Sequence, residues 1–172
     1  MICHPISAFT LPPGGRRGEY CEVPSGRGFI ALLEAFRATG GTAPGDVVAR
    51  LLEEHQPGRA VSLAKFIYSG QAFGFEWRTS LWIPMFQFDA DDLVLKSSAQ
   101  RVRAELPPGW SGWALAWWFA VPNALLNGRS PADTLDADLD GVVRSARSLE
   151  LESREEFPLA QPRRAREVVA QV

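Results

Sequence analysis

The chain has 172 residues, of which 46% are hydrophobic and 22% are charged. This composition is typical of one globular domain or two small ones, and it excludes a disordered tail, a collagen-like fibre and a disulfide-dense miniprotein. Eighteen basic residues stand against twenty acidic ones, for a net charge of −2. The chain as a whole is therefore not a polybasic nucleic-acid binder, although a local basic face can still exist.

The first part of the chain is predicted to form an arm followed by a helix. Residues 1–27 contain several prolines and glycines without apolar periodicity, which indicates an N-terminal arm. From Phe29 onward the apolar side chains recur at the spacing of one helical face. These side chains are Phe29, Leu32, Leu33 and Phe36. Gly40 and Gly41 are expected to end this helix.

Two more helices and a β-hairpin complete a predicted unit over residues 28–92. Thr42 is expected to cap a second helix near 44–55, and Ser62 a third near 62–69. Aromatic-rich extended runs over 71–88, joined by Arg78-Thr79-Ser80, predict the hairpin.

Pro84 limits the second strand of that hairpin. Proline has no N–H group to donate across a sheet, so this strand either lies at an edge or ends at Pro84. All six tryptophans fall between 77 and 118. They begin in the hairpin and continue into the next helical region, which is how one continuous core would be built across the two halves of the chain.

Residues 93–156 are predicted to be helical. A helix near 98–106 is expected to begin at a Ser97 or Ser98 cap and to stop at the Pro107-Pro108-Gly109 run. The next helix, near 111–121, is apolar on all sides, so we expect it to be a central core helix.

The segment after this core helix is rich in capping residues. Pro122 ends the helix, and Asn123 can cap a single turn that Gly128 then breaks. The run Ser130-Pro131-Ala132-Asp133 is a helix start, with a serine cap and proline at the first helical position. A final helix is expected to follow Asp138 or Asp140, and residues 157–172 form a charged C-terminal tail.

The sequence gives little indication of a metal site, a disulfide framework or a membrane-spanning segment. Cys3, His4, Cys21 and His55 lack the close spacing of a zinc site, and no nucleophile motif or phosphate-binding loop is present. Two cysteines do not make a disulfide framework, and no secretory signal or membrane-length apolar run is present. We expect a cytoplasmic protein that is not an enzyme, with no metal, cofactor or membrane contact.

The stretch from Leu93 to Leu149 resembles the toxin-binding domain of Xre/MbcA/ParS-type antitoxins. The resemblance rests on Trp118-Phe119-x-x-Pro122-Asn123-x-x-Leu126-x-Gly128-Arg129-x-Pro131, followed by Leu135 and Val142-Val143-x-x-Ala146-Arg147. Ile83-Pro84-Met85-Phe86-Gln87-Phe88 is similar to the segment that precedes this domain in the family. Together these motifs cover residues 83–149, close to two-fifths of the chain.

The resemblance implies a helical domain that neutralises a cognate toxin, often a RES-domain toxin that degrades NAD. The expected partner-binding residues are Asn123, Gly128, Arg129, Pro131, Arg163, Arg164 and Arg166. Arg129 is the exposed cation expected at this surface. Asn123, Gly128 and Pro131 are expected to shape the backbone more than to touch the toxin. A homodimer is also expected, because dimers are common in this family.

Antitoxins of this family usually carry an N-terminal helix-turn-helix as well. The helices near 44–55 and 62–69 and the hairpin resemble a degenerate winged helix-turn-helix. The fold predicted for the whole chain is therefore mainly α with a small β-hairpin (α+β). Candidate contacts to operator DNA are Arg59, Lys65 and Arg78, which are fewer cations than such domains normally place against phosphates.

Two alternatives remain open from the residues themselves. The protein could be a transcriptional regulator that binds DNA through residues 44–88 without any toxin partner. It could instead be a small hydrolase or ligand-binding domain with an aromatic pocket in its tryptophan-rich centre, although a buried core explains the same residues.

Overall fold

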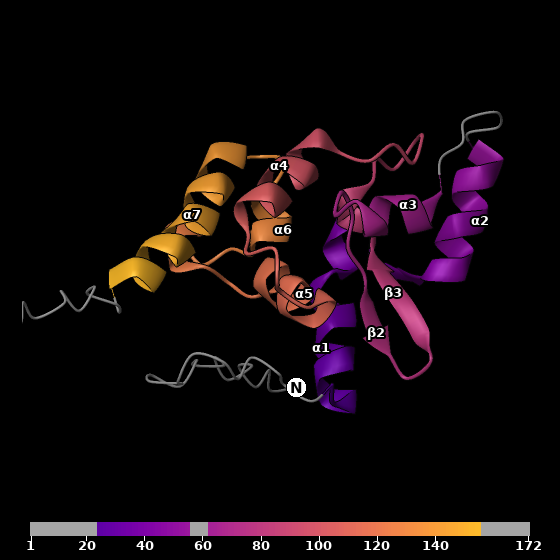
Figure 1. The fold of residues 1–172 in the computed structure, drawn as a ribbon, viewed down its shortest axis with the longest axis horizontal. Coiled ribbons are helices and arrows are strands. Elements are labelled where there is room, and N and C mark those ends of the chain that lie inside the picture. The colour runs from indigo at the N-terminus through magenta and orange to yellow at the C-terminus, as the bar shows by residue number, and fades with distance from the viewer. Residues whose placement is uncertain (1–23, 56–61, 156–172) are drawn as a thin grey trace, which may run out of the picture.

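The expected mixture of helices and a little β-structure is confirmed in a computed structural model, which describes residues 24–55 and 62–155 (Figure 1). The first half contains α1 (Gly26–Ala35), the 3-10 turn η1 (Arg37–Thr39), β1 (Thr42–Pro44), α2 (Gly45–His55), α3 (Leu63–Tyr68), β2 (Phe75–Trp77) and β3 (Ser80–Pro84). The second contains η2 (Met85–Gln87), α4 (Ser97–Glu105), α5 (Gly112–Ala120), η3 (Ala124–Leu126), α6 (Pro131–Thr134) and α7 (Leu139–Glu155).

The strands form one antiparallel sheet in the order β1-β3-β2. The predicted hairpin is confirmed but is shorter than expected, since β2 and β3 together span only 75–84. The central strand β3 ends at Pro84, which is the second of the two possibilities that the proline allowed. In Figure 1, α2, α3 and the hairpin lie at one end of the molecule, and α4, α6 and α7 lie at the other.

Two of the predicted helix caps are wrong, and both errors come from pairing with distant segments. Thr42 does not cap α2, because its backbone pairs with Pro84 in strand β1, which the sequence did not predict. The cap of α4 is Lys96 rather than a serine, and it makes no side-chain capping bond. The Lys96 N–H donates to the Gln87 carbonyl oxygen at 2.8 Å. The helix therefore begins at Ser97, one residue earlier than a cap at Ser97 would allow.

The predicted cap at Ser62 is confirmed, since its side chain accepts a hydrogen bond from the Lys65 N–H at the start of α3. The sequence did not predict the cap of α5, where Ser111 accepts one from the Ala114 N–H. At the start of α7, the Asp138 carboxylate accepts from the Gly141 N–H. Each cap satisfies an N–H group that has no partner inside the helix.

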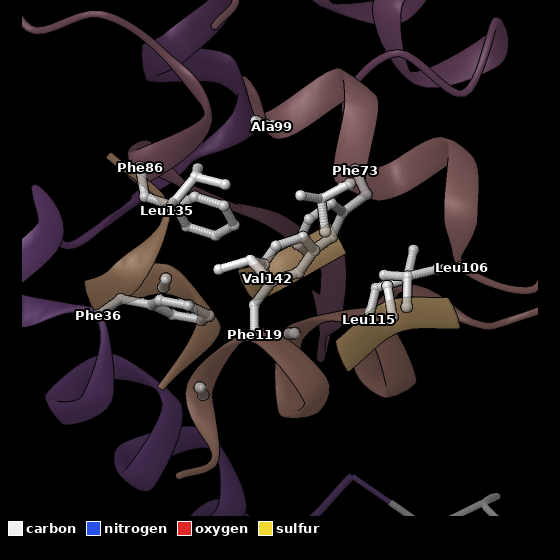
Figure 2. Close-up of a cluster of buried hydrophobic side chains, with 14 of the residues drawn as sticks. Phe36, Phe73, Phe86, Ala99, Leu106, Leu115, Phe119, Leu135 and Val142 are labelled. Carbon is white, nitrogen blue, oxygen red and sulfur yellow. The ribbon is translucent and has the colours of Figure 1, made fainter. Parts of the chain in front are cut away.

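One large hydrophobic cluster joins the two halves of the chain. Leu32, Phe36 and Phe75 from the first half pack in it with Leu115, Phe119 and Val142 from the second. Figure 2 shows Phe119 among the labelled side chains of this cluster, near Phe73 and Val142. The boundary predicted at 92/93 therefore falls inside a shared core, as the run of tryptophans suggested. A second cluster lies under α2, α3 and the sheet, around Val48, Leu52 and Ile83.

The apolar helix α5 is central to the large cluster, as expected. Leu115, Ala116 and Phe119 on this helix are buried. Its first turn lies so close to the start of β2 that a Cβ atom on Gly112 would overlap the Gly74 carbonyl group. The Trp113 Nε1 donates to the Glu76 carbonyl oxygen at 2.6 Å, which gives this indole N–H the acceptor that it needs. No described helix is long and apolar enough to cross a bilayer.

A buried glutamine connects the sheet to the large cluster. Gln87 is 2% exposed. Its Oε1 accepts from the Phe73 N–H, and its Nε2 donates to the carbonyl oxygens of Phe73 and Pro84, at 2.9 to 3.0 Å. These bonds satisfy both backbone groups of Phe73, which precedes β2, and the carbonyl group of Pro84, the last residue of β3.

The substitution Gln87→Met keeps the side-chain length and leaves those three backbone groups without the amide. We expect it to lower the free energy of unfolding by about 3 kcal/mol, measured by urea denaturation. Gln100→Met is the matched control, because Gln100 is half-buried and makes one long bond of 3.4 Å to the Leu95 carbonyl oxygen. Equal losses in the two variants would show that Gln87 has no special role.

Candidate functional site

The segment from Asn123 to Pro131 forms a tightly hydrogen-bonded loop between α5 and α6. The Asn123 Oδ1 accepts from the Leu125 N–H at 2.8 Å, and the Asn123 N–H donates to the Arg129 carbonyl oxygen at 3.0 Å. The Gly128 N–H donates to the Asn123 carbonyl oxygen at 2.9 Å. Gly128 has a φ of 76°, a left-handed conformation that favours glycine. These bonds fix the loop, which we call the Asn123–Pro131 loop.

The loop presents an apolar side chain and a cation to its surroundings. Leu125 is 62% exposed, although the rest of its turn is fixed by hydrogen bonds. Arg129 is also exposed, and its Nη2 donates to the Asp133 carbonyl oxygen at 2.8 Å. This bond holds the exposed guanidinium against α6.

Four predicted partner-binding residues lie in this loop, and they have different roles. Asn123 and Gly128 shape the backbone as expected, through the cap and the left-handed turn. Pro131 is buried at the first position of α6, so its side chain offers little surface to a partner. Leu125 was missed by the sequence reasoning. Its signal was an apolar residue inside a one-turn helix bounded by Asn123 and Gly128.

A groove with a cavity volume of about 620 Å³ lies beside the loop. Its lining comes from three segments, 38–40, 85–96 and 129–136, and includes Arg129 from the loop. The ammonium group of Lys96 on its wall forms an ion pair with Asp136 at 2.7 Å. None of the six tryptophans lines this groove. Five of them, Trp82, Trp110, Trp113, Trp117 and Trp118, pack instead against the buried residues of the large hydrophobic cluster.

Two of the three candidate DNA contacts, Lys65 and Arg78, lie on separate elements at the other end of the molecule (Figure 1). Lys65 is exposed on α3, and Arg78 is exposed in the turn between β2 and β3. The Arg78 guanidinium lies 5.8 Å from the centre of the Trp77 ring, within the range of a cation–π interaction. Arg59, like Arg163, Arg164 and Arg166 of the predicted tail, lies outside the described residues.

The histidine that the structure describes is part of a helix end. The Nδ1 of His55 lies 2.9 Å from the Leu51 carbonyl oxygen in the last turn of α2. Within 24–55 and 62–155, no three histidine, cysteine or acidic side chains come together as metal ligands. Cys3, His4 and Cys21 are outside those ranges.

The sequence matches no family model, no curated protein and no solved structure. What the Asn123–Pro131 loop and the groove do is therefore inferred from their residues and geometry, together with the motif resemblance.

The Asn123 side chain acts in this loop only as an acceptor, which gives a direct test of its role. Asn123→Ala removes the cap and is expected to lower the free energy of unfolding by about 1 kcal/mol. Asn123→Asp retains an accepting oxygen and is expected to stay close to the wild type. Thermal and urea unfolding of the two variants measure this difference, and equal stability of the alanine and aspartate variants would contradict the capping role.

Proposed function

We propose that this protein is an antitoxin-like binding protein that neutralises a cognate toxin by direct contact and catalyses no reaction itself. The observation that carries the proposal is the Asn123–Pro131 loop, which holds Leu125 and Arg129 exposed on one hydrogen-bonded backbone. A fixed loop loses little conformational entropy on binding, so its exposed apolar group can contribute fully to affinity.

Leu125 and Arg129 are suited to different parts of such an interface. Burial of an exposed leucine against a partner removes apolar surface from water and so contributes favourable binding free energy. An arginine can donate charge-assisted hydrogen bonds, and arginines are enriched among the residues that contribute most to binding. The motif at 118–131 that resembles the antitoxin family specifies Arg129, whereas Leu125 falls at one of its unspecified positions, so Leu125 is proposed from its exposure alone. The family resemblance points to a RES-type, NAD-degrading toxin as the candidate partner.

The substitution Leu125→Asp tests this surface. The protein encoded by the adjacent reading frame serves as the probe, and its affinity for the full chain is measured by calorimetry. We expect the aspartate to weaken binding at least about tenfold, because a charge would replace the apolar anchor. Growth rescue and the cellular NAD level on co-expression report neutralisation in the same variants.

Ile30→Asp is the matched control, because Ile30 on α1 is 65% exposed and lies outside the loop. It should bind the probe like the wild type. A chain that ends at residue 156 separates the loop from the predicted tail arginines, and its full affinity would remove Arg163, Arg164 and Arg166 from the interface. Wild-type affinity of Leu125→Asp would overturn the proposed surface.

A second candidate function is DNA binding by residues 44–88, and one observation favours it. The element order α1-β1-α2-α3-β2-β3, with the sheet order β1-β3-β2, resembles that of a winged helix-turn-helix, in which α3 would be the recognition helix. Lys65 and the 95% exposed Tyr68 lie on α3, and Arg78 lies at the wing. Two copies of the chain would double these few contacts.

Binding to the DNA upstream of the gene tests this second candidate. Lys65→Ala and Arg78→Ala should each weaken binding and make it less dependent on salt, because each removes one phosphate contact. Arg144→Ala on α7 changes an exposed arginine of the other half and should have no effect. A mobility-shift titration at several salt concentrations measures this, and no complex at low salt would reject DNA binding.

A further inference from the structure

The groove beside the Asn123–Pro131 loop has walls of small and charged side chains over an apolar floor. Phe86, Phe88 and Leu135 line the floor but are at most 4% exposed. The accessible lining includes Ala38, Gly40 and Ala90, which have little or no side chain. Pockets for small organic ligands are usually lined by many accessible apolar and aromatic groups, whereas the aromatic rings here are buried and the half-buried Met85 is the large apolar side chain that the lining leaves accessible. Small residues instead let a polypeptide backbone approach closely.

The charges on the groove walls leave an acidic excess. Three carboxylates, those of Asp89, Asp133 and Asp136, stand against the cations of Lys96 and Arg129. The ion pair with Asp136 offsets the charge of Lys96. The Asp89 and Asp133 carboxylates accept hydrogen bonds from the Asp91 N–H and the Ser130 hydroxyl, and neither of these donors carries a charge.

We propose that this groove binds a basic extended segment of the same partner protein that contacts the Asn123–Pro131 loop. Arg129 belongs to both the loop and the groove wall, so the two surfaces are continuous. A partner placed on Leu125 reaches the groove without leaving the surface, and its lysines or arginines find Asp89 and Asp133 there. The inference rests on the proposed function and specifies that the segment of the partner that enters the groove is extended and basic.

Two substitutions test the groove with the adjacent gene product as the probe. Ala38→Arg places a long cation in the groove, and we expect it to weaken binding about tenfold or more through steric exclusion and charge repulsion. Asp89→Asn removes one charge and keeps an oxygen that can accept the Asp91 N–H. It should weaken binding about threefold and reduce the dependence of affinity on salt.

The controls separate this inference from the proposed function. Ala104→Arg adds the same cation at an exposed position of α4 outside the groove and should bind like the wild type. Circular dichroism and the unfolding midpoint establish that Ala38→Arg is folded, and Asp89→Asn tests the groove without added bulk. Full affinity in both groove variants, with binding lost in Leu125→Asp, would overturn the groove proposal and leave the loop as the interface.

Two further results would also decide against the groove. Loss of binding in Ala38→Arg with an unchanged affinity and salt dependence in Asp89→Asn would show that the bound segment is not basic, which overturns the proposal. No binding of the probe to the wild-type chain would overturn the proposed function and the groove proposal together.

Discussion

The buried amide of Gln87 is the interaction on which the rest of the structure depends. One primary amide supplies an acceptor for the Phe73 N–H and donors for two carbonyl groups, in a place that water does not reach. Buried backbone groups without partners are costly, so a methionine or a carboxylate at this position cannot replace the glutamine. The amide thus fixes where the chain before β2 crosses the chain after β3.

The position of this crossing determines how the aromatic rings of the large cluster meet. The Phe73 ring stacks on Phe119 at a centroid distance of 5.5 Å, and the Phe86 ring lies 4.8 Å from Phe119 and 5.5 Å from Phe36. Phe119 belongs to α5, so the sheet region and the C-terminal helices are held by the same contacts. One wall of the groove comes from the residues around Phe86 and another from α6, and the shape of the groove therefore depends on this packing.

The sequence was most informative where the determining contacts are local. The caps at Ser62 and Asn123 and the helix start at Ser130 were predicted correctly, because each bond joins residues only two or three positions apart. The sequence did not predict strand β1, because β1 forms only by pairing with the distant strand β3. It did not predict the Lys96 cap, because the Lys96 N–H is bound by Gln87 on the other side of a turn. The groove could not be predicted for the same reason, since its lining residues come from three separate segments. Arg129 was predicted as an exposed cation, but the exposure of Leu125 depends on the whole loop.

The distribution of charge in the C-terminal half bears on the kind of partner that we propose for it. Three exposed arginines among the described residues of this half are engaged with the protein itself: Arg147 donates two hydrogen bonds to Glu105, Arg101 lies 3.6 Å from Asp140, and Arg129 donates to the Asp133 carbonyl oxygen of α6. The pair with Arg147 also lowers the pKa of Glu105, mainly through the side-chain hydrogen bond. A phosphate backbone is attracted by a row of cations that neighbouring carboxylates do not offset. Each of these cations has an acidic or carbonyl partner, and the groove is acidic. The described residues of this half therefore support the proposal of a protein partner with apolar and basic groups more than they support a nucleic acid.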